Sequence, residues 1–291
     1  MVPSARLLAR IAAMEVRGRQ RHWSFIPAAL ARRLRPRVVS VADGLATLMA
    51  ASDALHVNRV VGLGRRRVAK PSDLEGLIAI YREAGLRRFR LELPPGPFAR
   101  ASEAAVLARG FRRTGAYALL VRDLSRPIAS ATAGPRVSRA RRRELGEAVD
   151  IFARVFGSPP SRRAWALASV EAGHTEPFLA WAGGRPVAAG SLRVERDIAW
   201  LIGGATLPRW RHLGAHAALI DVRLRRARAL GCRWAWSEAS PPTPGKPSGS
   251  YRNLLRHGFE PAGEKRIFLW TSRARMPKTK GRARGPTRGT A

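Results

Sequence analysis

The chain has 291 residues, of which 45% are hydrophobic, so it is long enough to bury one large core or two ordinary ones. Its single cysteine, Cys232, excludes a disulfide framework and a cysteine-rich metal site. A formal net charge of +34 implies a surface that attracts polyanions. The longest stretch without a charge, 198–208, is too short to cross a bilayer, and the first 23 residues are too often interrupted by arginine for a signal peptide. We therefore expect a cytoplasmic protein without a membrane partner.

In the first half, the residues up to about 37 are only weakly patterned. One clear succession of elements follows later in this half. Ser72 and Glu75 form a predicted capping box at the start of a helix. The sequence YREAGLRRFRLELPPG then predicts the end of that helix, a C-terminal cap at Gly85, an alternating strand and a loop with proline. A short helix and a Gly-Phe pair follow. This half should span residues 1–124.

A segment rich in Pro, Ser, Ala and Gly follows this half, and we take residues 125–138 as a linker. The second half, 139–272, begins with two predicted helices, the first of which ends at Gly157. A hairpin around residues 183–184 and a nearly charge-free strand come next. Within that strand Gly203 and Gly204 suggest a bulge or a close backbone approach.

A long helix follows in the second half, with Leu213, Ala217, Ile220, Leu224 and Ala227 on one predicted face. A strand, a short helix and a final strand complete this half. Residues 273–291 carry seven positive and no negative charges, which predicts a disordered basic tail.

The two halves end alike, which suggests an internal duplication. RARALGCRWAWSEASPP and YRNLLRHGF in the second half repeat the order of helix end, glycine, strand, proline loop, short helix and Gly-Phe seen in the first. By this alignment Glu92 is the counterpart of Glu238. The first half has no glycine at the place that corresponds to Gly214, and its capping box satisfies the helix start internally.

The stretch LPRWRHLGAHAALI, residues 207–220, places Arg211 and Gly214 where the long helix begins. The first N–H groups of a helix lack intrahelical partners and carry partial positive charge, so a phosphate placed there satisfies both. Gly214 would let the phosphate approach the backbone, and Arg211 would add a cation. The pattern predicts a pyrophosphate site.

The order of hairpin, Gly-containing strand and Pro-x-x-Arg-x-x-Gly entering a helix resembles the GNAT superfamily of acyl-CoA N-acyltransferases. RHLGAH matches that family's Arg-x-x-Gly-x-Gly/Ala signature, with His216 at the last position, and SGSYRNLLRHGF resembles its fourth-helix motif. The resemblance covers about residues 139–272. It implies an α/β (α+β) chain of two GNAT-like domains, each with a mixed, mostly antiparallel sheet flanked by helices, of which the first is degenerate.

The resemblance implies an acetyltransferase that uses acetyl-CoA as co-substrate. Its pyrophosphate would bind the backbone of residues 212–217, namely His212, Leu213, Gly214, Ala215, His216 and Ala217. The strand edge at Ala205 and Thr206 would pair with the pantetheine arm. Asn253 could hydrogen-bond the cofactor or cap a loop.

The amine acceptor must lose a proton to become a nucleophile, and Glu238 and Glu195 are the candidate bases. The family's thiolate-protonating tyrosine is replaced by Leu254, with Tyr251 as a weak substitute. His212 and His216 have the spacing of a helical metal pair but no third ligand nearby, so we expect no metal.

We therefore expect an N-acetyltransferase that acts on a small-molecule or peptide amine by direct attack. One alternative is a non-catalytic regulator that binds acyl-CoA. Another is a polyanion-binding protein on the same scaffold. Nucleic acid is a possible partner through the basic surface and tail, but it is not favoured because no nucleic-acid motif accompanies the charge.

Overall fold

The computed structural model describes residues 4–128, 134–244 and 248–272, and the predicted basic tail lies outside these residues. The described strands are β1 (Pro36–Val41), β2 (Gly44–Met49), β3 (Arg59–Val61), β4 (Arg88–Leu93), β5 (Arg112–Asp123), β6 (Arg136–Arg139), β7 (Glu176–Ala182), β8 (Arg185–Glu195), β9 (Ile198–Thr206), β10 (Trp234–Ala239) and β11 (Glu260–Thr271). The helices are α1 (Ala5–Trp23), α2 (Ala28–Leu34), α3 (Pro71–Glu83), α4 (Pro97–Ala101), α5 (Glu103–Ala108), α6 (Leu145–Phe156), α7 (Arg163–Glu171), α8 (Ala215–Ala229) and α9 (Gly249–Arg256), with short 3₁₀ turns at Arg142–Glu144, Pro160–Arg162 and Pro208–Trp210.

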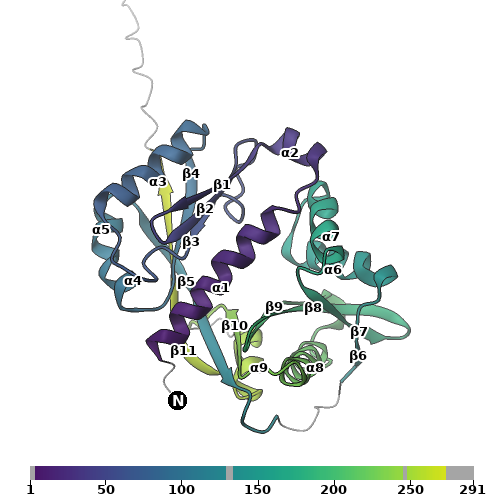
Figure 1. Cartoon of the computed structure of the whole chain (residues 1–291). Coiled ribbons are helices and arrows are strands. Elements are labelled where there is room, and N and C mark those ends of the chain that lie inside the picture. The colour runs from purple at the N-terminus through teal and green to yellow at the C-terminus, as the bar shows by residue number, and fades with distance from the viewer. Residues whose placement is uncertain (1–3, 129–133, 245–247, 273–291) are drawn as a thin grey trace, which may run out of the picture.

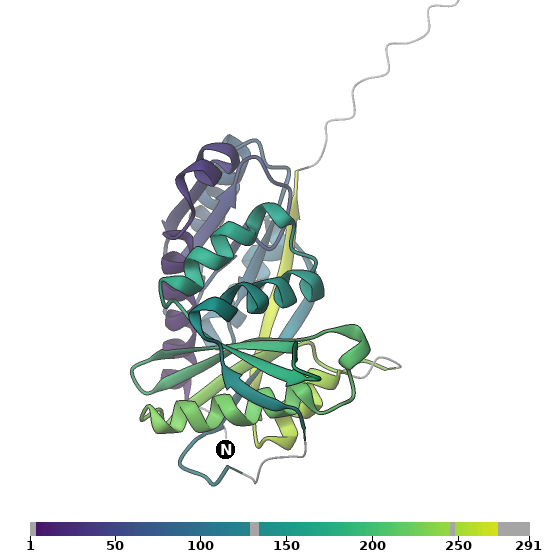
Figure 2. The same cartoon turned by 90° about the vertical axis from the view of Figure 1, so that its right-hand side faces the viewer.

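These strands form one continuous sheet with the order β1-β2-β3-β4-β11-β5-β10-β9-β8-β7-β6. Its pairs are antiparallel except for β3 with β4 and β9 with β10, which are parallel and each keep only three residue pairs. The long strand β11, drawn in yellow, runs through the middle of the molecule beside β5 (Figures 1 and 2). The α/β class with a large, mostly antiparallel sheet flanked by helices is confirmed.

The two central strands are exchanged between the halves of the chain. β11 belongs to the second half but pairs with β4 of the first, while β5 belongs to the first half and pairs with β10 of the second. The arrangement is symmetric, because β4 and β10, and likewise β11 and β5, occupy matching places in the sheet order. The end of the expected linker forms strand β6, which pairs with β7.

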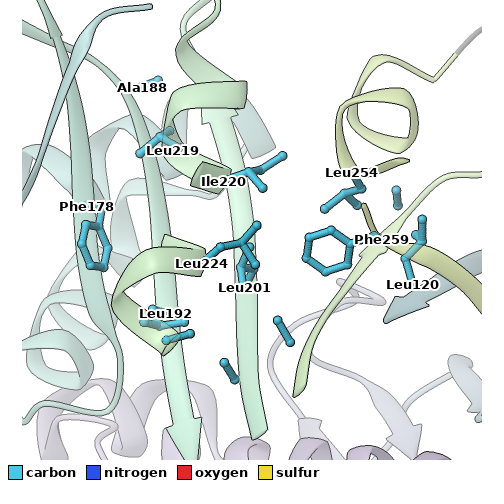
Figure 3. Packing of buried hydrophobic residues seen from close by; sticks show 14 of the residues in the cluster. Leu120, Phe178, Ala188, Leu192, Leu201, Leu219, Ile220, Leu224, Leu254 and Phe259 are labelled. Carbon is cyan, nitrogen blue, oxygen red and sulfur yellow. The ribbon is translucent and has the colours of Figure 1, made fainter. Parts of the chain in front are cut away.

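Helix α8 covers one face of the second half, and Figure 3 shows its apolar side chains against strands β7 to β9. Leu219, Ile220 and Leu224 are fully buried there. The prediction was wrong for Leu213, which is 55% exposed, because α8 begins only at Ala215 and leaves Leu213 in the preceding loop.

Helices α1, α6 and α7 lie on the opposite face of the second half. Figure 1 shows α1 crossing diagonally between the first half and α6–α7. His22 of α1 stacks on Trp165 of α7 with ring centroids 4.4 Å apart, and the indole of Trp165 donates to the His22 carbonyl at 2.9 Å. These contacts fix α1 against the second half. None of the described helices is long and apolar enough to cross a membrane.

The start of α3 is satisfied from within the chain, but by other residues than predicted. The helix begins at Pro71, so Ser72 is already inside it, and the Asp73 carboxylate accepts from the N–H of Lys70 at 2.7 Å. Glu75 instead pairs with Arg109. Asp73 also pairs with Arg67. The start of α3 thus carries a carboxylate of its own, whereas the start of α8 has bare N–H groups.

Candidate functional site

The site is built where β9 and β10 separate. The two strands pair from Ile198 to Trp200 and from Trp234 to Trp236, and the last pair stacks its indole rings at 4.4 Å. Beyond it the Ser237 hydroxyl still donates to the Leu201 carbonyl at 2.9 Å, and then the pairing stops. The two strands therefore separate after Trp200 and Trp236.

A bulge in β9 lies directly beyond this point, as Gly203 and Gly204 suggested. Ser191 pairs with Ile202 and Ala189 with Ala205, so Gly190 alone faces both glycines. Gly203 has a φ of 62°, and a Cβ on it would lie 2.8 Å from the Phe152 ring. The bulge thus needs glycine for its conformation and for its contact with α6.

Arg223 of α8 donates hydrogen bonds to the bulge from the α8 face of the sheet. It is 1% exposed, and its Nη1 donates to the carbonyls of Ser191 (3.1 Å), Ile202 (3.4 Å) and Gly203 (3.0 Å). Burial lowers the pKa of Arg223 to about 9, which leaves it charged at pH 7. Three strand carbonyls are therefore fixed by one buried guanidinium.

The loop before α8 has two residues in the left-handed backbone region. His212 and Gly214 both have positive φ, 68° and 76°, and Gly214 caps the helix without a side chain. Within the described chain, no acceptor receives the backbone N–H groups of residues 212–217. Arg211 is exposed beside them, as is the side chain of Leu213, whereas Ala215 is buried. The residues present fit an anion, because a row of free N–H groups meets the positive end of α8.

His216 turns its ring under the helix. The ring lies against Gly204, where a Cβ would fall far inside contact distance of Nε2, and its Nδ1 accepts from the Asn253 amide at 3.1 Å. Burial first, and then Arg223 and His257, lower the pKa of His216 to about 4, so the ring is neutral at pH 7. The structure therefore brings Asn253, His216 and Gly204 together, and the missing side chain at 204 makes room for a large one at 216.

Ala205 and Thr206 complete β9 after the bulge. They pair on one side with Ala189 and Ala188 of β8. On the other side the β10 pairing has already ended at Trp236, so no described strand uses this edge. An extended chain placed there would find free backbone groups.

Glu238 lies in β10 just beyond the separation and belongs to a buried charge cluster. Its carboxylate forms an ion pair with Lys265 of β11, which also pairs with Glu15 of α1 at 2.7 Å and lies 3.8 Å from Glu92. Burial raises the pKa of Glu238 against the attraction of Lys265. If the β9–β10 register continued, Glu238 would be level with Ile202 on the α1 face.

Glu92, the counterpart of Glu238, is 1% exposed and forms ion pairs with Arg59 and Arg90. Burial alone would raise the pKa of Glu92, but Arg59, Lys265 and Arg90 lower it to about 2. Glu92 is thus charged at pH 7, and its carboxylate is already surrounded by three cations.

Glu195 lies elsewhere. It ends β8 at the hairpin with β9, where Glu195 pairs with Ile198, at the opposite end of β9 from the bulge. Its carboxylate accepts from Nε of Arg17 at 2.8 Å and pairs with Arg193. The structure therefore does not bring Glu195 to the start of α8.

Two further features from the sequence concern the missing tyrosine and a possible metal site. Leu254 is 3% exposed in the core shared by α8 and α9, while Tyr251 is partly buried beside it. Among the residues that the structure describes, no three His, Cys, Asp or Glu side chains are placed to hold a metal.

Sequence reasoning missed Arg223 and Lys265. A signal for Arg223 was present, since it is four residues after Leu219 and four before Ala227 on the buried face of α8. Lys265 carried no such signal, because its three carboxylate partners come from α1, β4 and β10.

Comparison with solved structures shows the GNAT fold. The chain is similar to a GCN5-related N-acetyltransferase from Kribbella flavida, with 19% identity and a TM-score of 0.61 over 92% of this chain and 96% of that one. It is also similar to one from Sphaerobacter thermophilus, with 12% identity and a TM-score of 0.57 over 93% and 94%. A tandem GNAT protein from the clavulanic acid biosynthesis pathway matches with 15% identity and a TM-score of 0.57 over 78% of each chain. No family model and no curated protein matches the sequence.

Proposed function

We propose that this chain, which has the GNAT fold, is an N-acetyltransferase that transfers an acetyl group from acetyl-CoA to an amine. The observation that carries the proposal is the row of backbone N–H groups at residues 212–217, which have no acceptor within the described chain and lie at the start of α8. The pyrophosphate of the donor would accept from these groups, with Arg211 beside it. The pantetheine arm would pair with the free edge at Ala205 and Thr206.

In the proposed reaction the neutral amine attacks the thioester carbonyl, and the C–S bond breaks as the new C–N bond forms. The amine proton passes to a base, and the CoA thiolate leaves and takes up a proton. We propose Glu238 as the base, because it lies beyond the strand separation on the α1 face, whereas Glu195 is at the far end of β9. The raised pKa of Glu238 suits this role.

Asn253 acts indirectly in this proposal. Its amide holds the His216 ring against Gly204 and so fixes the first turn of α8. We propose that the acceptor is a small-molecule or peptide amine and that the protein works in the cytoplasm.

The test is calorimetric titration with acetyl-CoA at low and moderate salt. Saturable one-to-one binding that persists at moderate salt is expected, because the backbone cradle is local, whereas general attraction to the basic surface weakens steeply with ionic strength. The variant Arg211→Ala with Gly214→Glu should abolish binding. Normal binding by this variant would refute the placement of the donor site.

A matched control exists in the first half. Gly85 has a φ of 74°, close to that of Gly214, and Arg87 is exposed nearby. Arg87→Ala with Gly85→Glu makes the same charge change at a second positive-φ glycine, and its acetyl-CoA affinity should equal that of the unaltered protein.

One observation favours a second candidate, a regulator that binds acyl-CoA without catalysis. Leu254 occupies the core position where the family often carries its tyrosine acid. Amine screening after the titration decides between the two, because a regulator would bind acetyl-CoA and release no free CoA thiol with any amine.

A further inference from the structure

A cavity of about 780 Å³ lies between the two halves of the chain, on the sheet face opposite α8. One wall is α1, a second is α6 and α7, and the floor includes Trp200, Ile202 and Gly203 of β9. Its volume is in the range of pockets that enclose small organic ligands. Because Gly203 belongs both to the bulge and to this floor, the cavity adjoins the strand separation where the thioester is proposed to lie.

The cavity wall has more cations than carboxylates. Of its acidic residues, Asp150 pairs with Arg163 at 2.7 Å and Glu15 with Lys265 at 2.7 Å. Three lining arginines form no ion pair with any carboxylate in the described parts of the chain: Arg19, Arg154 and Arg162. The cavity therefore carries uncompensated positive charge over an apolar floor.

Arg162 is the most unusual of the three, because it is only 8% exposed. Among the described residues, its guanidinium has one hydrogen bond, a long one of 3.4 Å from Nη2 to the Ser52 hydroxyl, and its buried Nη1 has no partner there. The Nε of Arg19, across the cavity on α1, also lacks an acceptor. A buried guanidinium is costly unless acceptors replace its lost hydration. Arg223 has strand carbonyls for this purpose, whereas Nη1 of Arg162 has no acceptor in the described parts of the chain, and a ligand anion would supply one.

The surroundings of Arg162 are neutral rather than acidic. Burial, then Arg162 and Arg90, lower the pKa of His56 to about 4. Burial, then Arg193 and Arg21, lower the pKa of His174 to about 4. Both rings are uncharged at pH 7, and because an imidazole is either neutral or a cation, neither can supply the negative charge that Arg162 lacks.

We propose that this cavity binds the amine acceptor and that the acceptor carries an anionic group, a carboxylate or a phosphate, which pairs with Arg162 and Arg19. The inference rests on the proposed acetyl transfer for the identity of the ligand as an acceptor. The apolar floor at Trp200 and Ile202, with Phe152 of the α6 wall, holds the body of the molecule, and its amine points to Gly203.

Two matched probe pairs test the charge. L-phenylalanine and L-phenylalaninamide differ in a carboxylate, and phosphotyramine and tyramine differ in a phosphate, while every probe has an amine and an aromatic body. Their binding is measured by calorimetry and ligand-observed NMR at millimolar concentrations. In at least one pair the anionic member should bind about tenfold more tightly, and the pair that shows the preference identifies the anion.

Arg162→Met should remove this preference and leave the neutral probe unaffected. The control is Arg154→Met, which removes an exposed arginine from the same cavity and should retain most of the preference. Thermal unfolding verifies that both variants fold. Equal binding of charged and neutral members, binding of neither pair, or a preference that survives Arg162→Met would each overturn the inference.

Titration of the same variants with acetyl-CoA separates the two proposals. Unchanged acetyl-CoA binding by Arg162→Met is expected, and its loss would mean that the cavity holds the donor, which contradicts the inference. If the unaltered protein binds no acetyl-CoA but prefers anionic amines through Arg162, the proposed function fails while the anion site stands.

Discussion

The imidazole ring of His216 occupies the space beside Gly204 that a side chain at position 204 would require. Gly204→Ala should therefore destabilise the protein by about 1–3 kcal/mol, the cost of overpacking a well-filled site. His216→Ala should relieve the clash, so that the double variant is more stable than the sum of the single effects predicts. Urea unfolding of the four proteins measures this coupling. Additive effects would show that the ring and the strand do not compete for space.

Arg223 should stabilise the bulge that forms the site. Arg223→Met leaves the carbonyls of Ser191, Ile202 and Gly203 without their donor, and we expect a loss of about 2 kcal/mol in the free energy of unfolding. Acetyl-CoA affinity should fall as well, because the free edge of β9 begins at the bulge. The exposed Arg228 on the same helix provides the control, since Arg228→Met should change neither quantity. An Arg223→Met protein with full stability would contradict this role.

The two candidate bases should respond differently to amide substitution. Glu238→Gln should lower kcat about a hundredfold or more without unfolding the protein, because Lys265 keeps Glu15 and Glu92 as partners. Glu195→Gln removes ion pairs with Arg17 and Arg193 at the far end of β9 and should change kcat by less than about twofold. Steady-state kinetics with an accepted amine decides. The reverse ranking would move the base to the other end of β9.

Stability should fall between neutral and mildly acidic pH. Burial, with His174 and Arg193, lowers the pKa of His22 to about 3, and the pKa of His216 falls to about 4, against an ordinary value of 6.5. The unfolded chain therefore binds protons first as the pH falls. The stability contributed by neutral His22 and His216 is complete above pH 6.5, and it is lost between pH 6.5 and about 4 for His216 and between pH 6.5 and about 3 for His22.

Between pH 7 and 5 this loss should be about 4 kcal/mol for the two rings together. Urea unfolding at pH 7, 6 and 5 measures it. His22→Gln should remove the share of one ring, about 2 kcal/mol in this interval, while His56 and His174, whose pKa values are also lowered to about 4, keep their own contributions. An unchanged slope would show that His22 does not titrate in this way.

The sequence predicted features that depend on residues close together in the chain. Gly214 marks the start of α8 because a helix cap with positive φ favours glycine, and Gly203 in β9 marks the bulge for the same reason. At α3 the local prediction missed the cap by two residues. Pro71 is favoured at the first helical position and Asp73 is placed to cap it, and together they outweigh the Ser72–Glu75 pair.

Features that depend on distant pairing escaped prediction. The duplication suggested that each half completes its own sheet, yet β5 and β11 change places. Both strands are long and mostly apolar in their buried parts, and nothing in their own residues records which neighbour they pair with. The cavity likewise arises only when α1 meets α6 and α7, so the isolation of Arg162 cannot be seen along the chain.

The exchange of β5 and β11 has a consequence for the order in which the chain can fold during synthesis. β4 and β5 leave the ribosome early, but the strand that fills the gap between them comes about 140 residues later, as the last described strand. Until then both strands present open edges, which are templates for wrong pairing. Neither half can complete the sheet alone, and only a chain translated through Thr271 closes it. A stalled or truncated product should therefore be captured by chaperones or degraded.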